Sequence, residues 1–209
     1  IATEFECYAL GIEAQEKLGA CVVGDESGRT CRFVSLAECL KLTGSENFFH
    51  EGVLCTEPSL ETNCKPHVST GCVESLDQVF WFDSCGNKMN VYDYSKRNDE
   101  KYKTQVVSLN ETCVVSGDNS NADSCGNCNH FAGSRCFNYK PGVDKKPKTG
   151  NSVCRNLDCV YNGKNYKNGE SWCVYDGFIG EGKDTVGSRH WRASCVEGEV
   201  SFEGCADYR

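Results

Sequence analysis

The sequence lacks long hydrophobic runs and has fewer basic than acidic residues. Its longest apolar stretches, such as Val79–Phe82, have the length of a strand. A transmembrane helix needs about 20 consecutive apolar residues, so we expect no membrane span in this chain. The 22 lysines and arginines are outnumbered by 30 aspartates and glutamates, giving a net charge of −8. Because nucleic-acid binding requires a basic surface, we also expect no nucleic-acid partner.

Motifs of several common enzyme classes are missing as well. The chain has no G-x-S-x-G, no S-x-x-K and no phosphate-binding loop that ends in Lys-Ser or Lys-Thr. Its histidines form no H-E-x-x-H pair. Each of these motifs places a nucleophile, a phosphate or a zinc ion at a fixed position on a turn or helix. The sequence therefore predicts a protein that is not an enzyme and binds no cofactor.

What the sequence does have is cysteine, at about 8% of its positions, which is typical of a disulfide scaffold. Disulfides persist in oxidising compartments, so we expect a secreted or cell-surface protein. Each native disulfide contributes about 2–4 kcal/mol to stability. The pool of cysteines for such bonds is Cys7, Cys21, Cys31, Cys39, Cys55, Cys64, Cys72, Cys85, Cys113, Cys125, Cys128, Cys136, Cys154, Cys159, Cys173, Cys195 and Cys205.

The cysteine count is odd, at 17. Eight bonds within the chain leave one cysteine over, which in a secreted protein indicates a bond to another chain or a free thiol. A third explanation is that the chain is cut from a longer one. A chain that begins at Ile1 is also what signal-peptide removal leaves behind, so we expect a cleaved leader.

Local patterns predict short strands and little helix. Ser35 and Glu38 form a capping box, and Gly44 is a stop signal, which together predict a helix of about two turns. Asn162-Gly163 lies between β-forming residues and predicts a hairpin with a type I′ turn. Further strands are expected at 78–82, 88–94 and 171–175, and tight turns within 21–28 and 195–202.

These patterns predict a mostly β fold of small disulfide-rich modules with short antiparallel sheets and one or two short helices. The polar stretch 116–122 reads as a linker. We therefore expect an N-terminal cysteine-rich region over 1–117, divisible into 1–65 and 66–117, and a C-terminal β domain over 122–209. Residues 140–151 read as an exposed loop. The segments Asp83–Asn87 and Asp123–Asn127 have identical sequences, which we interpret as a shared turn type.

Possible metal sites are weak. Cys125 and Cys128 form the only C-x-x-C, and His130 or Cys136 would complete a zinc site on paper. Among so many cysteines, structural disulfides are the favoured interpretation. The acidic stretch 118–123 resembles the start of a calcium loop, but it lacks the oxygen ligand at its third position. The sequence thus predicts no metal.

Two surface features are candidates for modification or binding. Asn110 belongs to the only N-x-S/T sequon and is a predicted glycosylation site. Arg189, His190, Trp191 and Arg192 form the densest cluster of basic and aromatic residues. One interpretation is a surface that binds an anionic or carbohydrate ligand. The alternative, which we favour, is that Trp191 packs in a small core while Arg189 pairs with an acidic strand.

Two stretches resemble known types of sequence. Residues 21–55, with Cys21-Val22-Val23, Cys31, Glu38-Cys39 and a final cysteine, resemble a short cysteine-rich module repeated in large secreted microbial proteins. The copy here has one opening cysteine where the module usually has two. Residues 79–94 and 125–191 are similar to uncharacterised cysteine-rich surface proteins predicted in small-genome archaea. This resemblance implies an extracellular, multi-domain surface protein and supplies no catalytic residues.

These observations predict a structural or adhesive subunit of a cell-surface assembly, such as a filament, a sheath or an adhesin. Its expected partners are further copies or other surface proteins, joined through an interchain disulfide or an exposed strand edge. A secreted ligand- or glycan-binding module is the alternative, and a secreted hydrolase is the third.

Overall fold

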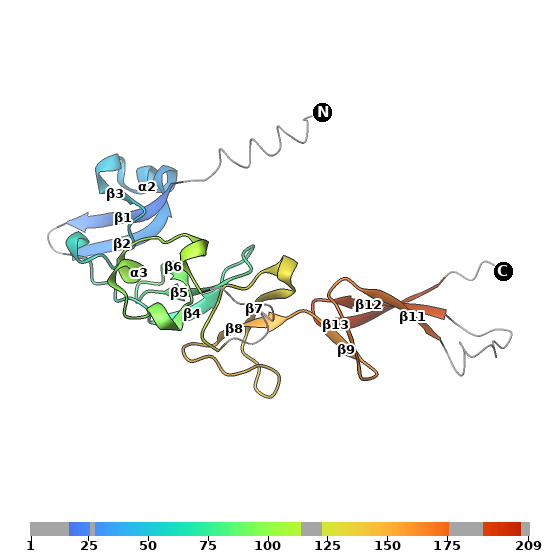
Figure 1. Ribbon diagram of the computed structural model, residues 1–209. Helices are drawn as coiled ribbons and strands as arrows, with labels where there is room; N and C mark the ends of the chain where they lie inside the picture. The colour runs from blue at the N-terminus through green and yellow to red at the C-terminus, as the bar shows by residue number, and fades with distance from the viewer. Residues whose placement is uncertain (1–16, 26–27, 114–122, 176–189, 206–209) are drawn as a thin grey trace, which may run out of the picture.

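The computed structural model describes residues 17–25, 28–113, 123–175 and 190–205. Within these ranges the chain is mostly β, with five small antiparallel sheets and two short α-helices. Figure 1 shows the sheets following one another along the molecule, from β1–β3 at one end to β11–β13 at the other. The predicted fold class is therefore confirmed. No helix in the described ranges is long and apolar enough to cross a bilayer.

The N-terminal module is a three-stranded sheet with a helix beside it. Strands β1 (Leu18–Asp25), β2 (Gly28–Ser35) and β3 (Phe49–Glu51) are ordered β2-β1-β3. Helix α2 (Leu36–Thr43) begins as predicted, because the Ser35 hydroxyl accepts a hydrogen bond from the Glu38 N–H at 3.3 Å. It ends at Gly44, whose φ of 74° is the left-handed conformation that closes a helix.

The central sheet has the order β4-β5-β6, formed by β4 (Ser69–Cys72), β5 (Val79–Phe82) and β6 (Lys88–Val91). Strand β5 is buried along most of its length, as a run of Val and aromatic residues requires. Trp81 packs edge-on against Tyr92 at a centroid distance of 4.9 Å. Helix α3 (Glu100–Thr104) adds the buried Tyr102 to the same core.

The central core continues across the predicted linker. Strands β7 (Ser134–Asn138) and β8 (Ser152–Asn156) pair with each other. Cys128, Cys136 and Cys154 pack in one cluster with the aromatic residues of the central sheet. The division at about residue 120 stays a prediction about independent folding. In the structure, the two sides share this core and the disulfide Cys72–Cys136.

The C-terminal unit is built from two hairpin systems. Strands β9 (Cys159–Tyr161) and β10 (Lys164–Tyr166) form one hairpin. Asn162 and Gly163 have φ of 49° and 76°, which confirms the predicted type I′ turn. Strands β11 (Ser171–Tyr175), β12 (His190–Val196) and β13 (Glu199–Gly204) form the last sheet, in the order β11-β12-β13.

Short 3₁₀ turns connect these elements. They are η1 (Glu46–Phe48), η2 (Pro58–Leu60), η3 (Tyr94–Lys96), η4 (Leu109–Glu111) and η5 (His130–Ala132).

The repeated pentapeptide adopts two different structures, so the prediction of a shared turn type is wrong. In the first copy, Gly86 has a φ of 82° in the turn between β5 and β6. In the second copy, Gly126 does not have a left-handed φ, and its backbone packs directly against Val79 and Tyr92. Its N–H donates to Tyr92 O at 2.7 Å, and its carbonyl accepts from the Val79 N–H at 2.8 Å. A Cβ on Gly126 would lie 2.7 Å from Val79, so this position requires close approach rather than positive φ.

The predicted exposed loop at 140–151 has a buried anchor. Asp144 is buried and accepts hydrogen bonds from the Arg155 guanidinium at 2.6 and 2.8 Å and from the Lys140 N–H at 2.7 Å. Burial alone would raise the pKa of the Asp144 carboxyl. The hydrogen bonds from Arg155 and Lys140 outweigh burial, so this pKa lies below its usual range.

Asp144 is therefore expected to contribute stability that depends on pH. A carboxyl whose folded pKa is depressed stabilises the protein above its unfolded pKa of about 3.9, and this contribution is lost as the pH falls through the folded pKa. We expect Asp144→Asn to lower the free energy of unfolding by about 2 kcal/mol at pH 7, because Arg155 loses its partner in a partly exposed site. Urea unfolding from pH 7 to pH 2 should show the difference shrinking. A constant difference would contradict this account.

Candidate functional sites

The disulfide array is the most extensive feature of the molecule. The described cysteines form seven bonds: Cys21–Cys39, Cys31–Cys55, Cys64–Cys85, Cys72–Cys136, Cys113–Cys125, Cys128–Cys154 and Cys159–Cys195. The Cα–Cα separations run from 5.3 to 5.9 Å. All lie within the range of about 4.4–6.8 Å that an unstrained disulfide needs. A chain with this many bonds is a disulfide-stabilised protein of the kind found in oxidising, extracellular settings.

The bonds are interleaved rather than sequential. The first two cross each other in sequence, so residues 21–55 form one covalently closed block. Cys72–Cys136 crosses both Cys64–Cys85 and Cys128–Cys154, and it encloses Cys113–Cys125. Residues 64–154 are therefore a second block, and 159–195 are a third. Only the short connections 56–63 and 155–158 lie between blocks.

Metal and redox interpretations of the cysteines find no support among the described residues. Cys125 and Cys128 are bonded to different partners, Cys113 and Cys154, as the structural interpretation predicts. One group in these ranges, Cys64, Asp83 and Cys85, has metal-like proximity. Its two sulfurs are bonded to each other, and the Asp83 carboxylate accepts hydrogen bonds from the N–H groups of the turn. Residues 118–122 of the calcium-like stretch 118–123 lie outside the described residues.

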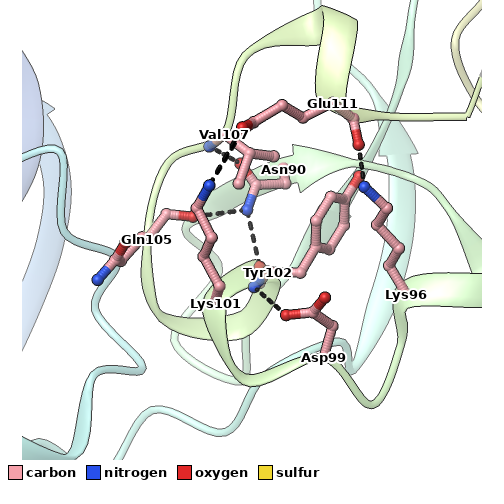
Figure 2. Close-up of polar contacts among 8 residues, drawn as sticks. All are labelled: Asn90, Lys96, Asp99, Lys101, Tyr102, Gln105, Val107 and Glu111. Atoms are coloured by element: carbon pink, nitrogen blue, oxygen red, sulfur yellow. Dashed lines mark hydrogen bonds and ion pairs between the residues drawn. The ribbon is translucent and has the colours of Figure 1, made fainter.

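A buried asparagine organises the segment that carries the glycosylation sequon. Asn90, on β6, is 5% exposed. Its amide nitrogen donates to Tyr102 O at 2.7 Å and to Gln105 O at 2.8 Å, and its oxygen accepts from the Val107 N–H at 3.0 Å. Figure 2 shows this one side chain joining α3 to the chain that follows it. No sequence motif marks Asn90, because its role depends on backbone groups 12 to 17 residues away.

The same network holds the sequon in place. Glu111 accepts a hydrogen bond from Lys101 at 3.2 Å, and its carbonyl accepts one from Lys96 (Figure 2). Asn110 lies on η4 and is exposed, whereas the hydroxyl of the buried Thr112 donates to Leu109 O at 2.7 Å. Glycosylation of Asn110 stays a prediction, and the acceptor amide lies on the surface.

The predicted binding cluster is divided by its own strand. Arg189 lies outside the described residues. On β12, side chains alternate between the two faces, so Trp191 points away from the face that carries His190 and Arg192. Arg192 pairs with Glu203 on β13. The described members therefore do not share one surface, and the predicted pairing of Arg189 lies outside the described residues.

Aromatic residues pack on the other face of this sheet. Tyr166 stacks on Trp172 at a centroid distance of 3.5 Å, and Tyr161 lies 5.7 Å from both Trp172 and Phe202. Tyr161, Tyr166 and Trp172 cover the disulfide-centred cluster of Cys159 and Cys195 and form the small core of the C-terminal unit. Phe202 itself is exposed.

His67 is half-buried in the central core. Its ring stacks on Trp81 at 4.5 Å, and its Nδ1 lies 3.2 Å from Arg97 O. Burial lowers the pKa of His67 below its ordinary value, and the hydrogen bond to Arg97 opposes this only in part. The ring is therefore part of the aromatic packing around Trp81.

One cavity of about 340 Å³ lies on the N-terminal module. Its lining includes Val22, Arg29, Phe48, His50 and Leu60. No carboxylate or thiol is among the lining residues that the structure describes.

Two cysteines in the described ranges are free and exposed, Cys173 and Cys205. Cys173 is on β11, opposite Arg192 of β12. Cys205 directly follows β13, and its N–H donates to His190 O at 3.0 Å. Because β12 lies between β11 and β13, the two thiols are at opposite edges of one sheet.

The resemblances noted in the sequence stay predictions after comparison with known proteins. No family model, curated protein or solved structure matches the chain.

Proposed function

We propose that the chain is a structural segment of an extracellular, cell-surface assembly, and that its disulfides limit how far it can be extended under load. The role is mechanical rather than enzymatic. The observation that carries the proposal is the interleaving of the disulfides, which leaves only 56–63 and 155–158 between covalently closed blocks.

The interleaving shortens the covalent path through the molecule. From Cys21 to Cys195 the backbone runs over about 170 residues, or about 600 Å when fully extended. A path that crosses the bonds of Cys21, Cys31, Cys72, Cys128 and Cys159 follows only about 40 residues of backbone. Its extended length, bonds included, is about 160 Å. Sequential, non-crossing bonds would protect each loop but would not couple neighbouring modules in this way.

Single-molecule stretching tests the proposal directly. With handles on the two termini, the oxidised chain should reach a contour length about 400 Å shorter than the reduced chain, because the disulfides remove most of the backbone from the loaded path. The same molecules measured before and after adding a reductant provide the control. Equal contour lengths in the two states would overturn the proposal.

A further inference from the structure

The outer edge of β11 is an unpaired strand edge among the described strands. In the sheet order β11-β12-β13, β11 has a single neighbour. Along an antiparallel strand, the backbone N–H and C=O groups of successive residues point alternately toward one neighbouring strand and toward the other. The Cys195 N–H donates to Glu170 O at 2.9 Å, so the backbone groups of residues 170, 172 and 174 point toward β12. The backbone N–H and C=O groups of Ser171, Cys173 and Tyr175 therefore point outward. No described strand pairs with these groups.

The composition of β11 favours pairing. Its sequence, Ser-Trp-Cys-Val-Tyr, contains aromatic and β-branched residues and neither a charge nor a proline. Natural sheets usually protect edge strands with such residues, and an unprotected edge is a template for another chain. The opposite edge strand, β13, carries the exposed residues Glu199 and Glu203. The unprotected edge is therefore β11.

The symmetry of β11 identifies its partner. Cys173 is the central residue of the five-residue strand. When two copies of β11 pair antiparallel about a two-fold axis, Cys173 lies opposite Cys173 of the second copy. The Cα–Cα separation of such a hydrogen-bonded pair is about 5.5 Å, which matches the separation that a disulfide needs. We propose that a second copy of this chain adds to the β11 edge, and that a Cys173–Cys173 disulfide closes the resulting six-stranded sheet.

Other features of the sheet agree with this arrangement. The Cys173 thiol is exposed and lies on the face opposite Trp172 and Val174. In the symmetric pair, Trp172 of one copy faces Val174 of the other, so no like charges meet. A two-fold interface is also the commonest kind among homo-oligomers. The inference rests on the proposed structural role, because it names the partner of that assembly.

The Cys173–Cys173 bond can form by thiol–disulfide exchange with a small disulfide, such as oxidised glutathione. The Cys173 thiolate of one copy attacks the small disulfide and forms a mixed disulfide, and one small thiolate leaves. The Cys173 thiolate of the second copy then attacks the protein sulfur of the mixed disulfide, and the other small thiolate leaves. The two protons lost by the cysteines pass to the two leaving thiolates.

The test is oxidation of the full-length chain in a glutathione redox buffer, followed by non-reducing electrophoresis and mass mapping of the cross-linked peptides. We expect a covalent dimer containing one Cys173–Cys173 peptide. Cys173→Ser should abolish this dimer, and Cys205→Ser, which removes the other exposed thiol among the described residues, should leave it unchanged. Mapping of the seven internal disulfides in each variant checks that the fold is intact.

A second variant separates strand pairing from random thiol contact. Ser171→Pro keeps Cys173 but removes an outward N–H at the first residue of the edge strand, a position that tolerates proline. We expect its cross-linking rate to fall by about tenfold. A cross-link through Cys205, or an unchanged rate in Ser171→Pro, would overturn the inference. A purely monomeric chain would also overturn the inference. It would leave the proposed mechanical role untouched, because that role is tested by stretching single chains.

Discussion

Replacing Cys72 and Cys136 together by serine is expected to lower the free energy of unfolding by about 4 kcal/mol. This bond closes the longest loop in the array, with a sequence separation of 64. In the chain-entropy description, the stabilisation grows with the logarithm of loop length, which gives about 4 kcal/mol for a loop of this size. Cys136 also packs in the central core, so the loss includes some packing. Denaturant unfolding with the other bonds intact measures the change.

The same variant tests whether the two sides of residue 120 fold independently. Because β5 and β6 share one core with Cys136 of β7 and Cys154 of β8, we expect amides of β5 and β8 to lose hydrogen-exchange protection together. The matched control is the double serine variant of Cys113 and Cys125, which opens a loop with a separation of only 12. Its expected cost is about 3 kcal/mol. Unchanged protection in β8 alone would instead support two separate domains.

Replacing Asn90 by alanine is expected to cost about 3 kcal/mol. The substitution leaves two carbonyl groups and one N–H without their hydrogen-bond partner in a site that is largely closed to water. Each buried polar group left unsatisfied costs about 1–3 kcal/mol, and partial relaxation or water entry reduces the total. Chemical denaturation gives the change in stability, and amide exchange at Val107 locates it.

A matched control exists on the surface. Asn165→Ala, at an exposed position on β10, is expected to change stability by less than about 0.5 kcal/mol. Asn90→Asp keeps the size of the side chain but loses the donor to both carbonyls, so we expect it to be at least as damaging as Asn90→Ala. If Asn90→Ala behaves like Asn165→Ala, the segment around Asn110 is not held by this network.

Local chemistry predicted the local elements well. The Ser35–Glu38 capping box, the Gly44 stop and the Asn162-Gly163 turn each depend on a few neighbouring residues, and each lies where expected. The repeated pentapeptide shows the limit of this approach. Its two copies have the same sequence, but Gly86 lies in a turn, whereas Gly126 is enclosed by Val79 of β5 and by Tyr92, which follows β6.

Long-range contacts could not be predicted from the sequence, for a physical reason. Disulfide partners are chosen by proximity in the folded chain, and no spacing rule pairs Cys72 with Cys136. The contacts of Asn90 and the anchor of the 140–151 loop at Asp144 likewise depend on groups brought together by folding. The cluster around Trp191 looked continuous in sequence, but a strand places neighbouring side chains on opposite faces. No sequence motif distinguishes Cys173 from the other cysteines, because its position on an edge strand depends on the sheet order.

Peptide mapping of the disulfides in the native, oxidised protein tests the central claim most directly. The limit on extension depends on crossed connectivity in the middle block. We predict cross-linked peptides for Cys64–Cys85, Cys72–Cys136 and Cys128–Cys154. Bonds between sequence neighbours, such as Cys64 with Cys72 and Cys128 with Cys136, would leave the chain extensible between modules and would contradict the proposed role.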